Sequence, residues 1–157
     1  MPEQRPIKRD KAFITLSKDH HFSLLLVWKI RKDLAAGMHG KEITHYVLDF
    51  FKDSLQEHFK EEEETIFSRL PNEDTLRKQA EKEHKYICFL IELLNENDSN
   101  RDLQEQFADM LEAHVRFEER ILFNHLQETL KPEELEAISL IMNRCNEEGR
   151  KENKLFA

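Results

Sequence analysis

The stretch HFKEEEETIFSRL, residues 58–70, has the apolar spacing of a helix but places two polar side chains within the apolar stripe. Residues spaced three and four apart share one face of a helix. On that face, His58 and Glu62 lie between Leu55 and Ile66. A carboxylate inside a core is costly unless it is paired, protonated or bound to a metal ion. The stretch therefore predicts a helix with a polar site in its buried face.

The same pattern occurs a second time in the chain. HVRFEERILFNHL, residues 114–126, repeats the histidine and the glutamate at equal spacing, as His114 and Glu118. The preceding segments DHHFSLLL and EHKYICFL match more weakly and align His20 with His84. The chain thus resembles two helical hairpins, each with one lone histidine followed by an HxxxE pair.

Helix-breaking residues divide the chain into five expected helices. Only three glycines and four prolines occur among 157 residues, and 36% of the residues are charged, which is typical of an all-helical protein. The expected helices, with Ser17 and Asn72 as N-caps and Gly37 as a stop signal, span about 17–36, 41–70, 72–95, 101–130 and 132–147. Short turns between long helices predict an all-α, up-down-up-down four-helix bundle with a short fifth C-terminal helix.

The length fits one domain with a single core, expected at residues 13–147 between a flexible tail (1–12) and a polar tail (148–157). The net charge of −8, without a basic cluster, argues against nucleic-acid binding. No apolar run approaches the roughly 20 residues that cross a bilayer, and no secretory segment begins the chain. Cys88 and Cys145 form no CxxC pair. Free thiols and a cytoplasmic location are therefore expected.

Four histidines are expected at one level of this bundle: His20, His58, His84 and His114. Each consecutive pair is equidistant from a residue in the turn between its helices, namely 39, Pro71 and Ser99. In an antiparallel bundle, residues equally far from a turn lie at the same height. Glu62 and Glu118 would lie about 6 Å further along their helices, at about 1.5 Å per residue.

Four imidazoles and two carboxylates suit two transition-metal ions better than one tetrahedral zinc or a calcium ion. The expected ligands are His20 and His58 for one ion, His84 and His114 for the other, and Glu62 and Glu118 as bridges. A +4 step keeps Glu62 and Glu118 on the face of their histidines, whereas a +5 step rotates about 140° away. The remaining glutamates of these stretches are assigned to the solvated surface: Glu61, Glu63, Glu64 and Glu119.

Several other residues are further candidates for the site. His21 is the alternative to His20, Glu81 an auxiliary ligand, and Cys88 a small core residue or a redox group. His45 and Asp49 form another HxxxD pair. Glu42–His45 and Glu81–His84 are ExxH pairs, the ferritin-like di-iron signature, but His45 lies about 20 Å from the histidine layer. Trp28 and the phenylalanines are expected in the core, and Phe59, Phe117 and Tyr86 are expected to wall the site.

These residues resemble the hemerythrin-like domain family, in its bacterial HHE cation-binding branch. The resemblance covers about residues 13–140 and depends on DHH (19–21), HFKEEE (58–63), EH (83–84) and HVRFEE (114–119). It implies two non-haem iron ions with carboxylate and oxo or hydroxo bridges, with zinc or manganese as alternatives. Oxygen-carrying members have a further histidine on the third helix, where this chain has Ala80 and Cys88. This difference argues against reversible oxygen carriage.

The sequence leaves three hypotheses for function. The first is a metal-binding protein that binds or senses O2 or NO, or the iron or redox state. The second is a di-iron enzyme that reduces NO or peroxide, or handles iron for the repair of iron–sulfur centres. The third is a structural bundle with buried histidines. No redox-cysteine domain is present to favour repair, and the oligomeric state does not follow from the sequence.

Overall fold

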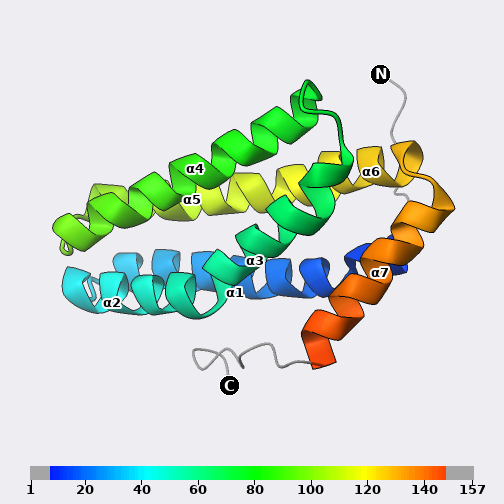
Figure 1. The fold of residues 1–157 in the computed structure, drawn as a ribbon. Helices are drawn as coiled ribbons and strands as arrows, with labels where there is room; N and C mark the ends of the chain where they lie inside the picture. Colours follow the sequence, from blue (N-terminus) through cyan, green and yellow to red (C-terminus); the bar gives the residue numbers. More distant parts are fainter. Residues whose placement is uncertain (1–7, 148–157) are drawn as a thin grey trace.

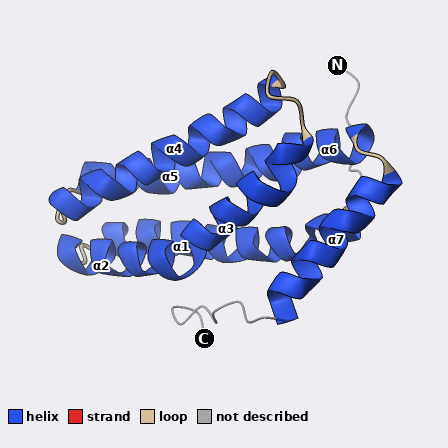
Figure 2. Ribbon diagram, in the orientation of Figure 1, coloured by secondary structure: helices blue, strands red, loops and turns tan. Residues whose placement is uncertain are grey.

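The computed structural model describes residues 8–147, and the elements in that range are all helical (Figures 1 and 2). The α-helices are α1 (Ile14–Ala35), α2 (Gly40–Phe50), α3 (Gln56–Glu61), α4 (Thr75–Glu96), α5 (Arg101–Phe117), α6 (Phe123–Thr129) and α7 (Pro132–Glu147). Short 3-10 turns form η1 (Lys11–Phe13) and η4 (Phe67–Arg69). The expectation of an all-helical protein is confirmed. The proposed tail at 148–157 and residues 1–7 lie outside the described residues.

Two helix starts differ from the prediction. Helix α1 begins at Ile14, because the 3-10 turn η1, capped by Asp10, leads directly into it and places Ser17 inside the helix. Helix α4 is capped by Asp74 rather than Asn72, since the Asp74 carboxylate accepts hydrogen bonds from the backbone of the first helical turn. The predicted stop after α1 is present, with Gly37 at a φ of 74°.

Three π-helical turns interrupt the long helical runs: η2 (Phe51–Leu55), η3 (Glu62–Ile66) and η5 (Glu118–Leu122). The last two begin at the glutamates of the two HxxxE pairs. A π-turn holds one residue more than an α-turn, so the residues after it are shifted by one position. Leu122 is therefore buried, whereas Ile121, which an unbroken α-helical period would place on the buried face, is 49% exposed.

The helices pack as a bundle of two hairpins. Helix α1 lies along α5, α4 also lies along α5, and α2 contacts both α1 and α4. Figure 1 shows α3 running obliquely and α7 crossing one end of the bundle. Helix α7 contacts η1, α1 and η3. None of the helices formed by residues 8–147 is long and apolar enough to cross a membrane.

The interior has two apolar clusters. Leu26, Ile87 and Leu111 belong to the first, and Phe13 and Phe123 belong to the second. Along each of the four long helical runs, one cluster ends where the other begins, and the predicted histidines lie at this boundary. The bundle therefore places its polar residues between two apolar layers that keep the helices together.

The prediction that Trp28 and all the phenylalanines belong to the core is wrong. Trp28 is 59% exposed, Phe89 is 51% exposed and Phe22 is 36% exposed. The error arose because large apolar residues are also common on protein surfaces. Trp28 lies on the outer face of α1, where the ammonium of Lys32 lies 4.9 Å from its ring centre.

The first residue of α2 is a glycine because the neighbouring turn approaches it closely. A Cβ atom on Gly40 would lie 2.9 Å from the carbonyl oxygen of Ser99. We expect Gly40→Ala to lower the free energy of unfolding by about 1–3 kcal/mol, as overpacking does. Urea unfolding measures this, with the exposed neighbour Lys41→Ala as control. An unchanged midpoint in Gly40→Ala would show that the two turns separate at no cost.

Candidate metal centre

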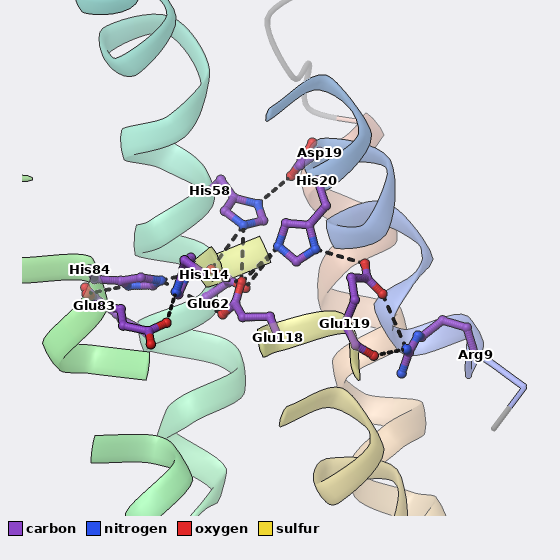
Figure 3. A network of polar contacts seen from close by, with 11 residues as sticks. Arg9, Asp19, His20, His58, Glu62, Glu83, His84, His114, Glu118 and Glu119 are labelled. Atoms are coloured by element: carbon purple, nitrogen blue, oxygen red, sulfur yellow. Dashed lines mark hydrogen bonds and ion pairs between the residues drawn. The ribbon is translucent and has the colours of Figure 1, made fainter. Parts of the chain in front are cut away.

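Six polar side chains meet inside the bundle, each with at most 3% of its surface exposed (Figure 3). Helices α1, α3, α4 and α5 supply one histidine each, and the first residues of η3 and η5 supply two glutamates. The six residues are His20, His58, Glu62, His84, His114 and Glu118. These are the six residues predicted as metal ligands from their spacing, and the structure brings all six together.

Every histidine directs its Nε2 atom at the two glutamates. The shortest distances are 3.0 Å from His58 and 3.1 Å from His84 to Oε1 of Glu62, and 2.9 Å from His20 and 3.3 Å from His114 to Oε1 of Glu118. Each glutamate therefore contacts one histidine from each of the two predicted pairs. A carboxylate shared between two cations needs this arrangement.

The ligand atoms form two overlapping groups. One group combines His20 and His58 with both glutamates, and the other combines His84 and His114 with the same glutamates. Within each group the atoms lie within 4.8 Å of one another. The arrangement can thus hold two cations side by side, with two carboxylates between them.

Unsatisfied polar atoms support the fit of cations to this centre. Four buried atoms make no aligned hydrogen bond among the described residues, although the two imidazole nitrogens lie 3.0 and 3.3 Å from a glutamate oxygen. They are Nε2 of His58 and His114 and one oxygen each of Glu62 and Glu118. Buried polar atoms of native proteins nearly always have partners, so such a set requires an explanation. Cations bound by these lone pairs would satisfy all four atoms, and imidazole nitrogens with carboxylate oxygens are suitable donors.

A second ring of carboxylates surrounds the histidines. Each histidine has its Nδ1 atom within hydrogen-bonding distance of an acid on another helix. The four contacts are His20–Glu119 at 2.9 Å, His58–Asp19 at 2.9 Å, His84–Glu63 at 3.0 Å and His114–Glu83 at 2.7 Å. An Nδ1–H that donates to a carboxylate leaves the Nε2 lone pair facing inward, as metal-binding histidines require.

The outer carboxylates follow the same repeat as the inner residues. Asp19 and Glu83 directly precede the lone histidines of the two hairpins, and Glu63 and Glu119 directly follow the two inner glutamates. The assignment of Glu119 to a solvated surface was wrong, because its side chain is 27% exposed and contacts His20. Glu63 is exposed as expected, at 48% of its side chain, but it also contacts His84. A residue next to a core position points at the neighbouring helix, where these acids reach another helix's histidine. Glu61, also assigned to the surface, is 7% exposed.

A comparison with protein families agrees with this geometry. The model of the hemerythrin HHE cation binding domain matches residues 15–126, which is more than half of the chain. The chain belongs to this family. Searches of curated proteins and of solved structures find no significant match.

All ten inner and outer residues of the centre lie within the part of the chain that matches the hemerythrin HHE family. Aromatic rings pack around the histidines of this hemerythrin-like domain. Phe59 stacks on His84 with 3.9 Å between ring centres, and Phe123 stacks on His20 at 5.5 Å. Tyr86, which was also expected to wall the site, is instead 42% exposed. The stacked rings limit the access of water to the imidazoles.

The charges of the hemerythrin-like centre are strongly coupled. Burial by itself lowers the pKa of His114, but the carboxylates of Glu118 and Glu83 outweigh it and raise the pKa to about 10. Burial also opposes the charged form of His58, whose pKa is nevertheless raised well above its usual value by Glu62 and Asp19. Burial raises the pKa of Glu118, but His114 and His20 outweigh this effect and hold it well below the usual range. Without cations, protons therefore balance the buried carboxylates.

Three other histidines, His21, His45 and His125, lie outside the hemerythrin-like centre. His21 is exposed, and His45 forms an exposed pair with Asp49 at 3.4 Å. His125 contacts the helix-capping Asp74 at 2.8 Å. In the described structure, His21 and His45 therefore lie on the surface, and His125 contacts a helix cap.

Two further candidates also have contacts of their own. Glu81 pairs with Arg77 on its own helix at 3.2 Å. Cys88 is half-buried beside the first apolar cluster, and burial raises the pKa of its thiol. A thiol held protonated in this way is a poor metal ligand.

Proposed function

We propose that the protein binds two iron ions in an up-down-up-down four-helix bundle and uses them to bind or sense O2 or NO, or the iron or redox state. The observation that supports this most directly is the sharing of Glu62 and Glu118 between two groups of histidine ligands. Membership of a cation-binding family supports the same conclusion. Zinc or manganese would suit the same donors, so the identity of the metal is part of the proposal.

The inner ligands, the outer carboxylates and the aromatic rings have different roles in this proposal. His20 and His58 would hold one ion, His84 and His114 the other, and the two glutamates would bridge them. The outer acids hold each imidazole in the tautomer that offers Nε2. A pair of iron ions held there would supply one-electron redox chemistry and affinity for a small diatomic ligand. The aromatic rings stacked on His84 and His20 would restrict access to the ions.

A cytoplasmic location is also part of the proposal. Neither Cys88 nor Cys145 forms a disulfide within the described part of the chain. Reduced thiols are typical of proteins kept in a reducing compartment. Such a compartment would also supply the electrons that keep bound iron in its ferrous form. Neither a nucleic-acid partner nor membrane binding is proposed.

Metal analysis tests the proposed centre. After reconstitution with ferrous iron under argon, we expect about two metal ions per chain, because the ligands form two groups with shared carboxylates. Exposure to air should then produce the absorption of an oxo-bridged iron pair. A metal content near zero after careful reconstitution would contradict the proposal, and two bound ions without this absorption would point to another metal.

Rapid mixing separates a binding protein from an enzyme. The reduced iron-loaded protein is mixed with O2, NO or peroxide, and the absorption of the iron pair is followed. We expect a stable adduct with O2 or NO that disappears when the gas is removed. Multiple turnovers with NO or peroxide would instead support the alternative of a di-iron reductase.

A further inference from the structure

The segment Lys8–Phe13, here called the N-terminal strap, is attached to α6 beside one half of the centre. Gln127 of α6 holds it through three hydrogen bonds. Its side-chain oxygen accepts from the backbone of Asp10 and from Nη1 of Arg9, each at 3.0 Å, and its amide donates to the carbonyl oxygen of Lys8 at 2.9 Å. Part of the region that the sequence analysis assigned to a flexible tail, residues 8–12, therefore has defined contacts.

Arg9 connects the N-terminal strap to a histidine of the centre (Figure 3). Its Nη2 atom lies 3.3 Å from Oε2 of Glu119 and donates to the carbonyl oxygen of the same residue. The other carboxylate oxygen, Oε1, lies 2.9 Å from Nδ1 of His20. Each oxygen of Glu119 thus has its own partner, and the carboxylate cannot rotate without breaking one contact.

Stacked groups support the same histidine from the side. The guanidinium of Arg9 lies 5.3 Å from the ring centre of Phe123. Phe13 also stacks on Phe123, at 4.8 Å, and Phe123 stacks on His20 at 5.5 Å. The N-terminal strap therefore restrains His20 through a hydrogen-bonded carboxylate and through a column of rings.

The matching half also has a stacked ring, since Phe59 lies on His84 at 3.9 Å, but among the described residues no arginine is hydrogen-bonded to Glu63, the outer acid of His84. The side chain of Glu63, which contacts His84, is 48% exposed, compared with 27% for Glu119. The repeat that aligns His20 with His84 aligns Arg9 with an acid, Glu73. Glu63 is therefore free to leave His84 at less cost than Glu119 would incur in leaving His20.

We propose that Arg9 is a positioning residue that fixes Glu119 on His20, so that the His20–His58 half holds its metal ion more tightly than the His84–His114 half. This inference rests on the proposed function, because it requires both halves to bind an ion. A carboxylate held on Nδ1 orients the imidazole and raises the basicity of its Nε2 atom, and losing such a partner typically weakens metal binding 10- to 100-fold. The two ions should therefore bind in a fixed order.

Cobalt(II) titration of the metal-free protein tests this order. Calorimetry and the absorption of bound cobalt should resolve two steps, the tighter one belonging to the His20–His58 half. In Arg9→Met, which retains the apolar stem, we expect the tighter step to weaken about tenfold. The weaker step should change less than about twofold. Arg9→Lys, which keeps the charge but loses the forked geometry, should restore part of the affinity.

The matched control is Lys11→Met. Lys11 lies in the same strap but pairs with Glu136 at 2.7 Å, away from the centre, and should leave both steps unchanged. The cobalt spectrum of the first-filled site should change in Glu119→Gln and not in Glu63→Gln. The opposite result would overturn the assignment of the tighter half. Glu119→Gln leaves the contacts between Gln127 and the strap in place. The cobalt spectrum of this variant therefore shows which half binds the first ion even if Arg9→Met does not fold.

The cobalt titrations distinguish a failure of the proposed metal-binding function from a failure of the positioning role of Arg9. If the wild-type protein binds no cobalt, the proposed metal-binding function fails, and the inference fails with it. If two ions bind but Arg9→Met weakens neither step, or weakens both steps equally, the metal centre stands and the positioning role of Arg9 is overturned.

Discussion

A Glu118→Ala variant is expected to lose both metal ions rather than one. The Oε1 atom of Glu118 lies 2.9 Å from Nε2 of His20 and 3.3 Å from Nε2 of His114, and these histidines belong to different ligand groups. Removing the carboxylate therefore removes a donor from each group and also a negative charge that both cations share. We expect each ion to bind more than about 100-fold more weakly, beyond the effect usual for an outer partner.

Metal analysis after iron reconstitution, together with cobalt titration, measures this loss. Glu118→Gln keeps the shape of the side chain and separates the missing charge from a packing defect. Glu105→Ala, on the exposed face of the same helix, should retain both ions. The pair Glu62→Ala and Glu64→Ala repeats the test on the other hairpin. A Glu118→Ala protein that keeps one ion at wild-type affinity would show that the carboxylate does not bridge.

The inner part of the centre could be predicted because it follows from helix geometry. Equal distances from the turns place residues of antiparallel helices at one height, and a +4 step keeps a glutamate on the face of its histidine. Both rules use only spacing along the chain. The structure accordingly brings together the residues proposed from the sequence, such as His58 with Glu62 and His114 with Glu118.

The outer carboxylates could not be placed by the same rules, because their contacts cross from one helix to another. Glu119 is rotated away from His114 on its own helix, yet it reaches His20 on α1. Which neighbour a flanking residue contacts depends on how the helices pack side by side. A signal was nevertheless present, since an acid adjoins each lone histidine and each inner glutamate in both hairpins. Asp19 and Glu83 illustrate it.

The π-turns limited the prediction of the fold. An α-helical period places Ile121 on the buried face after Glu118, but the π-turn moves Leu122 into that position. One inserted residue changes which later residues face the core. The few apolar residues that follow Glu118 fit both an unbroken α-helix and a helix with a π-turn, so the sequence could not decide between them. Two of the three described π-turns, η3 and η5, begin at the inner glutamates, in keeping with the frequent occurrence of π-turns at functional sites.

Metal binding is expected to become about tenfold tighter per pH unit for every proton that a cation displaces. An imidazole that carries a proton on both nitrogens cannot bind a cation, so binding must release that proton. In the metal-free protein the pKa of His114 is raised to about 10, because Glu118 and Glu83 outweigh the opposing effect of burial. The pKa values of His20 and His84 are raised by the same balance between burial and carboxylates. The affinity should therefore increase throughout the range from about pH 6.5 to about pH 10.

The stability of the metal-free protein should change in the opposite direction. His114 contributes stability that is fully present below its usual pKa of 6.5 and is lost as the pH rises through its folded value of about 10. Glu118, whose folded pKa is lowered, contributes stability above its usual value of 4.5 that is lost as the pH falls through the lower folded value. The metal-free protein should thus be most stable between about pH 4.5 and pH 6.5.

These two trends give one measurable difference, the gap in melting temperature between the cobalt-loaded and the metal-free protein. Metal binding stabilises the folded state in proportion to the logarithm of its affinity, so this gap should widen from about pH 6 to about pH 8. Calorimetric titrations in buffers of different ionisation enthalpy should show at least one proton released per ion. His45→Ala, which removes an exposed histidine outside the centre, should leave the gap unchanged. A gap that stays constant or narrows as the pH rises would contradict this prediction. It would mean that the four imidazoles are already neutral before the metal binds, so that unprotonated Nε2 atoms face Glu62 and Glu118 in the metal-free protein.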